Sequence, residues 1–157
     1  MGFFSLLFPR PVFIDDAVFG RLRREIFDKA TGKAWYVTEA LLFAPTDKHI
    51  GCYLDTPETG PTPAQQEFYQ YIEWHYAKFI DQLIPIIEDE FQNWRPDFRI
   101  NDFATKFSLT AISIPELDQL IESIAWDWSF DTVHDADHML TFYMSDGTAL
   151  PGMQMDG

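Results

Sequence analysis

One long helix between two strand-rich regions is the feature that most constrains the fold of this chain. Residues 62–92 start with Thr62 as the expected N-cap, Pro63 at the first helical position and Gln65 three residues after the cap, which is the pattern of a capping box. Pro85 lacks the N–H that a helix interior requires, so we expect it to kink the helix or to split it in two. Apolar and ring-bearing residues recur at spacings of three and four, which places them on one helix face: Phe68, Tyr71, Ile72, His75, Phe79, Leu83, Ile86, Ile87 and Phe91.

Alternation of apolar and polar residues before and after this helix indicates β-strands. Residues 15–55 are predicted to form an antiparallel β-meander with turns near Gly32 and Pro45, and residues 106–157 to form further antiparallel strands. We therefore predict a single α+β domain, residues 1–157, in which the helix and the strands pack as a helix-on-sheet layer. The strands are expected at 18–27, 35–43, 50–54, 107–114, 126–131 and 140–144.

The apolar N-terminal segment, residues 1–14, is not expected to be a secretion signal or a membrane anchor. No basic residue precedes its apolar run, and Pro9 ends that run early. The only cysteine, Cys52, lies in an apolar run and is expected to be a buried thiol rather than a nucleophile. A chain that cannot form an internal disulfide is typical of a reducing compartment, which predicts a cytoplasmic protein.

The net charge of −14 is concentrated in the second part of the chain. Residues 61–157 contain 4 Lys and Arg against 17 Asp and Glu, and residues 107–157 contain no Lys or Arg at all. Such a field repels nucleic acid and anionic membranes and attracts a basic protein. We expect a basic partner to bind Asp127, Asp131, Asp135 and Asp137, although acidity that only aids solubility would explain the same composition. The sequence leaves the oligomeric state open.

A short cluster of histidines and carboxylates is the strongest candidate for a metal site. Imidazole and carboxylate groups are ordinary metal ligands, but a polar loop that joins two strands explains the same cluster. No other metal-binding motif supports a site, so no cofactor is predicted. The candidate ligands are His134, Asp135, Asp137 and His138, with Asp131 or His75 as a further ligand.

Other patterns that carry chemistry are weak or missing. His75 lies on the apolar helix face, where a core histidine is expected more often than a general base. Asp127 and Asp131 share a strand face, as a pair of glycosidase carboxylates would, but any acidic strand shows the same spacing. The sequence contains no glycine-rich phosphate loop, nucleophile elbow or redox cysteine pair. The absence of these motifs favours a protein that is not an enzyme.

Several short motifs resemble a bacterial domain family of unknown function whose members open with an Asp-x-x-Phe-Gly strand. Some similar domains are encoded beside polymorphic toxins and are regarded as immunity proteins. The resemblance spans roughly residues 15–157 and implies a non-enzymatic, cytoplasmic, antitoxin-like binding protein, with no site residues implied. The motifs are Asp16-Ala17-Val18-Phe19-Gly20, the helix start Gly60-Pro61-Thr62-Pro63-Ala64-Gln65-Gln66, Trp126-Asp127-Trp128-Ser129-Phe130, and Met155-Asp156-Gly157.

Three functional hypotheses follow from the sequence. The first is an acidic protein-binding domain, in particular an immunity protein that neutralises a basic toxin such as a nuclease. The second is a metal-dependent enzyme centred on the segment from His134 to His138. The third is a housekeeping domain whose acidity has no partner. Salt-sensitive binding of a basic protein separates the first from the third, and metal content identifies the second.

Overall fold

A mixed, mostly antiparallel sheet and one long helix form the structure, a computed structural model that describes residues 10–118 and 123–156. The predicted α+β class is confirmed at this level. Residues 1–9 of the predicted N-terminal segment lie outside the described residues, and the rest of that segment includes the start of the first strand. The elements are β1 (Phe13–Asp16), β2 (Gly20–Asp28), β3 (Lys33–Phe43), β4 (Lys48–Pro57), α1 (Pro63–Gln92), α2 (Phe103–Lys106), β5 (Phe107–Ile114), β6 (Ala125–Thr132), β7 (Asp135–Ser145), β8 (Thr148–Ala149) and β9 (Gln154–Asp156).

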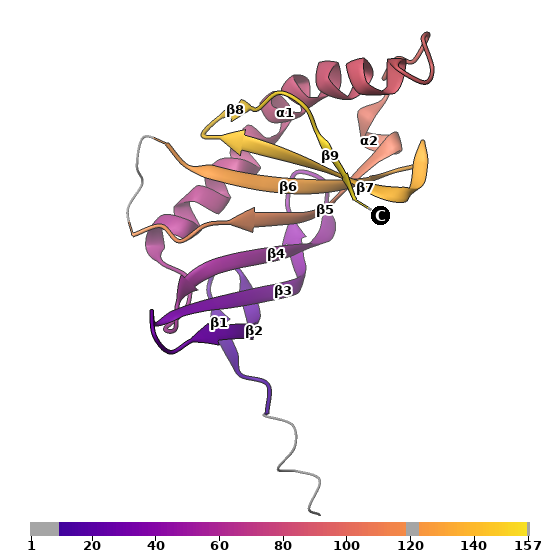
Figure 1. The fold of residues 1–157 in the computed structure, drawn as a ribbon. Helices are drawn as coiled ribbons and strands as arrows, with labels where there is room; N and C mark the ends of the chain where they lie inside the picture. Colours follow the sequence, from indigo (N-terminus) through magenta and orange to yellow (C-terminus); the bar gives the residue numbers. More distant parts are fainter. Residues whose placement is uncertain (1–9, 119–122, 157) are drawn as a thin grey trace, which may run out of the picture.

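The strands lie in the sheet in the order in which they occur in the chain, from β1 to β8, and β9 also pairs with β7 (Figure 1). Every pair is antiparallel except β4 and β5, which are parallel. The chain between these two strands contains α1, and a crossover of this length is what a parallel pair needs, because the chain must return to the end of the sheet from which it left. This parallel pair joins the two segments that were predicted to be antiparallel, and the prediction did not include it.

Helix α1 begins with the predicted capping box and continues without interruption to Gln92. The Thr62 hydroxyl accepts a hydrogen bond from the Gln65 backbone N–H at 3.2 Å, and the Gln65 side-chain oxygen accepts one from the Thr62 N–H at 3.1 Å. Pro85 does not split the helix, so that alternative of the prediction is wrong. Its side chain is exposed, and on that side water can bond to the helix carbonyl that the proline leaves without a donor. In the described part of the chain no helix is long and apolar enough to cross a membrane.

The core lies between α1 and the sheet face that it covers. Phe79 of α1 contacts both Trp126 and Trp128 of β6, with ring centroids 5.7 Å and 5.9 Å apart. These aromatic residues are buried together with Phe130. The tryptophan stripe of β6 is therefore core, as its alternation predicts. Cys52 is also buried, and this burial raises the pKa of its thiol. The thiolate, which is the nucleophilic form, is disfavoured there.

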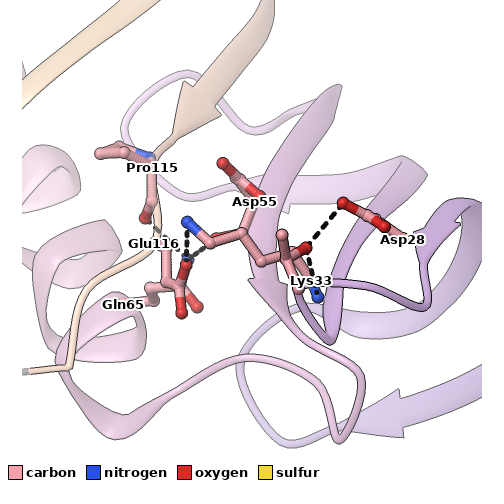
Figure 2. Close-up of polar contacts among 7 residues, drawn as sticks. Asp28, Lys33, Asp55, Gln65, Pro115 and Glu116 are labelled. Atoms are coloured by element: carbon pink, nitrogen blue, oxygen red, sulfur yellow. Dashed lines mark hydrogen bonds and ion pairs between the residues drawn. The ribbon is translucent and has the colours of Figure 1, made fainter.

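Gln65 ties the start of α1 to the sheet where β4 and β5 end. Its side chain is completely buried, and its amide nitrogen donates hydrogen bonds of 2.8 Å to the backbone carbonyls of Asp55 and Pro115 (Figure 2). Nearby, Lys33 forms an ion pair of 2.7 Å with Glu116. This network holds the beginning of the helix and the ends of two strands together.

Candidate functional site: the open face of the sheet

The sheet face opposite α1 presents aromatic and acidic side chains to solvent, and we call it the open face. One row of residues runs across the sheet from β1 to β7, and each residue in it is paired with the next. Beside this row, Trp35 of β3 is paired with Asp55 of β4. Side chains of directly paired residues lie on the same face of a sheet. The row is Phe13, Arg23, Val37, Tyr53, Ser113, Asp127 and Tyr143.

Large aromatic side chains on the open face are unusually exposed for a strand. The exposed fraction is 47% for Trp35, 39% for Tyr53 and 47% for Tyr143. The Tyr143 hydroxyl donates a hydrogen bond of 2.7 Å to Gln154 of β9, which holds that ring in place. Aromatic residues with a polar tip and a large apolar body are enriched in protein interfaces. The open face therefore has the composition of a binding surface.

A hollow of about 280 Å³ lies on the open face between β3, β4, β5 and β6. Trp35 and Tyr53 line one part of it, Asp55 and Asp127 add two carboxylates, and Ser113 lies between Tyr53 and Asp127 in the row. We call this hollow, with these five residues, the aromatic–acid pocket. Gln65 and its hydrogen bonds lie directly beneath its rim, because Gln65 binds the carbonyl of Asp55.

Asp127 is the half-buried carboxylate of the aromatic–acid pocket. Burial raises the pKa of Asp127, and a hydrogen bond with Ser113 partly opposes that shift. Among the residues that the structure describes, no Lys, Arg or His forms an ion pair with it. A carboxylate that is partly removed from water without a cation nearby is a favourable place for a cation of another molecule.

The four carboxylates predicted to bind a partner do not form one cluster. Asp127 lies in the aromatic–acid pocket, whereas Asp131 and Asp135 line a separate hollow of about 350 Å³ at the β6–β7 hairpin. Lys106 lines that second hollow as well, so cationic and anionic groups are mixed there. Asp137 is exposed on β7. Of the predicted set, Asp127 is the one that shares a pocket with exposed aromatic residues.

The predicted metal ligands do not converge on one point. Asp135, Asp137 and His138 lie on β7, whereas His134 lies in the turn before this strand. The expected loop is only a two-residue turn at Val133 and His134, because β7 begins at Asp135. The His138 Nδ1 lies 2.9 Å from a carboxylate oxygen of Asp135, whereas the His134 ring packs against Phe98, with centroids 5.0 Å apart. Within residues 10–118 and 123–156, no group of three His, Cys, Asp or Glu is placed to hold a metal ion.

His75 lies among aromatic rings on α1. Its Nδ1 is 3.0 Å from the backbone carbonyl of Tyr71, and its ring centroid lies 4.2 Å from that of Tyr71 and 6.1 Å from that of Phe79. These contacts are those of a packed helix residue, and they explain why an apolar helix stripe includes a histidine.

A larger hollow than the aromatic–acid pocket lies elsewhere, between α1, α2 and the β3–β4 turn. Its volume is about 410 Å³, and its walls are mainly apolar, including Tyr76, Ile80 and Phe103. None of the sequence-predicted site residues lines it. We consider the open face the better candidate because it combines exposed aromatic rings with the half-buried carboxylate of Asp127, which has no cation partner among the described residues.

Sequence reasoning missed the aromatic half of the site. The signal was present, since Trp35, Tyr53 and Tyr143 face away from the core and each is followed in its strand by a buried residue.

Three comparisons, with protein-family models, with curated proteins and with solved structures, gave no match for this chain.

Proposed function

We propose that this chain is a non-enzymatic, cytoplasmic protein-binding domain that binds a basic protein through the open face. The observation that supports the proposal is the presence of exposed Trp35, Tyr53 and Tyr143 beside Asp55 and Asp127 on the open face. Aromatic residues supply the apolar contact area on which most binding energy depends. The carboxylates supply the charge that selects the sign of the partner.

Charge supports a basic partner over other classes. The net charge is −14, and no Lys or Arg occurs after Lys106. The first strands contribute Arg21 and Arg23, so the acidic part of the open face is the half formed by β4, β5, β6 and β7. A partner with Lys and Arg opposite this half is attracted at long range and oriented as it docks.

The class of partner that fits best is a toxin with a basic, nucleic-acid-binding surface, which makes the chain an immunity protein. A nuclease needs positive charge to bind phosphate, and an acidic inhibitor that covers this charge blocks the substrate. The resemblance to domains encoded beside polymorphic toxins supports the same proposal. Under this proposal the chain performs no chemistry.

A capture experiment with two variants of equal charge tests the proposal. Wild type, Asp127→Lys and Asp89→Lys serve as immobilised baits for a lysate of the organism that encodes the chain. Asp89 is exposed on α1, away from the open face, so its variant changes the net charge by the same amount. We expect one basic protein to be retained by wild type and by Asp89→Lys at moderate salt and lost from Asp127→Lys. Equal retention by all three baits, equal loss from both variants, or no protein retained by wild type contradicts the proposal.

A further inference from the structure

We propose that the aromatic–acid pocket binds one arginine side chain of the basic partner. This inference rests on the proposed function and names the group that anchors the partner. It identifies Trp35 and Tyr53 as the stacking residues and Asp55 and Asp127 as the charge partners. The pocket volume of about 280 Å³ is suited to one long side chain rather than to a folded segment.

The aromatic walls of the pocket favour a planar cation. Trp35 is paired with Asp55, and Tyr53 lies two residues before Asp55 on the same strand, so both rings are neighbours on one face. Diagonal neighbours in a sheet are within reach of large aromatic side chains. A guanidinium stacks on such rings through cation–π and planar contacts, which the compact ammonium of lysine does less well.

The carboxylates of the pocket favour the same group. Asp127 is half-buried, and among the described residues it has Ser113 as its partner and no cation. A guanidinium presents several N–H donors in a fixed plane and can bind a carboxylate through two of them. Arginine is also less strongly hydrated than lysine, so it enters a partly buried site at lower cost.

The chain's own nearby cation is already engaged. Lys33 lies on β3 two residues before Trp35, which is the pairing partner of Asp55. The Lys33 ammonium forms an ion pair with Glu116 at 2.7 Å (Figure 2). Arg23, further along the row, forms an ion pair with Glu25 at 2.6 Å. Lys33 also interacts electrostatically with Asp55, so among the described residues Asp127 is the pocket carboxylate that has no cation partner and is left to an external cation.

Short peptides that differ in one side chain test this inference without knowledge of the partner. The probes are acetylated, amidated Gly-Arg-Gly, Gly-Lys-Gly and Gly-citrulline-Gly, where citrulline has the shape of arginine but no charge. Binding is measured by titrating each peptide into the isotope-labelled full chain and following the amide and indole N–H resonances. We expect saturable shifts for Trp35 and for residues near Asp127 with the arginine peptide, with binding about tenfold weaker for citrulline and clearly weaker for lysine.

Variants of the pocket and of the hairpin hollow provide the controls. Asp127→Asn keeps the shape and removes a desolvated charge, so the chain is expected to stay folded while arginine binding falls about tenfold. Asp131→Asn removes the same charge outside the pocket and is expected to leave binding unchanged. Equal binding of arginine and citrulline, no saturable shift, or equal loss in both variants overturns the arginine site. Such a failure leaves the binder proposal standing if the capture experiment still depends on Asp127, whereas failure of both experiments removes both.

Discussion

The buried Gln65 side chain gives the sharpest prediction about stability. Replacement Gln65→Met keeps the length and nearly the volume of the side chain but removes its three hydrogen bonds to Asp55, Pro115 and Thr62. Two part-buried hydrogen-bonded carbonyls and one capping N–H then lose a partner. An unsatisfied buried polar group costs about 1–3 kcal/mol and a lost cap about 1 kcal/mol, while the methionine recovers part of this by apolar burial. We expect the free energy of unfolding to fall by about 2–4 kcal/mol.

Urea denaturation followed by tryptophan fluorescence measures this loss, and the neighbouring glutamine is the matched control. Gln66 makes one part-buried hydrogen bond of 2.8 Å to Asp16, so Gln66→Met is expected to cost only about 0.5–1.5 kcal/mol. The midpoint should shift without a change in the slope of the transition, as it does when stability alone changes. A loss of less than about 1 kcal/mol for Gln65→Met, or equal losses for both variants, would refute the role of Gln65 as the link between α1, β4 and β5.

Two further predictions concern single titratable groups. Burial and the charges of Arg95 and Lys106 lower the pKa of His134 below its usual 6.5, so the folded state binds this proton less readily than the unfolded state. The stability contributed by neutral His134 is therefore present above pH 6.5 and is lost as the pH falls below it. In urea melts, the decrease in the free energy of unfolding between pH 8 and pH 5.5 should be smaller in His134→Asn than in wild type. An unchanged decrease contradicts the assignment. Burial raises the pKa of the Cys52 thiol, so a thiol reagent at pH 8 should modify the native chain far more slowly than the urea-unfolded chain. Fast modification of the native chain would show that β4 is not packed as described.

Local sequence signals predicted helix α1 and strand β6. The Thr62 and Gln65 pattern specifies the start of α1 because both hydrogen bonds form between neighbours in the chain. The alternation over residues 126–131 predicted a strand, and Trp126 and Trp128 are both in the core because every second residue of a strand faces the same way. These features depend on short-range geometry, which a single sequence records.

Features that depend on distant contacts could not be predicted. The bulge between Thr38 and Leu41 shifts the alternation of β3 by one residue. Tyr36 and Phe43 are therefore both buried, although strict alternation would place them on opposite faces of the sheet. The parallel pairing of Tyr53 with Ser113 joins residues on either side of α1, and no local pattern fixes that register. The aromatic–acid pocket exists only because this register brings β4 beside β5, and the four-carboxylate set predicted from charge alone therefore named just one of its residues, Asp127.

The affinity of the captured partner for two tryptophan variants is the most direct test of the open face as the binding surface. Trp35 lies on the open face, whereas Trp74, with an exposed fraction of 87%, projects from α1 on the opposite side of the sheet. Both Trp35→Ala and Trp74→Ala remove a large exposed aromatic side chain, so calorimetric dissociation constants compare the two faces at matched chemistry. Our account predicts that Trp35→Ala weakens binding by about 30-fold or more, as loss of an interface hot spot does, while Trp74→Ala leaves it unchanged. Loss of binding in Trp74→Ala with unchanged affinity in Trp35→Ala would contradict it and would place the interface on the helix.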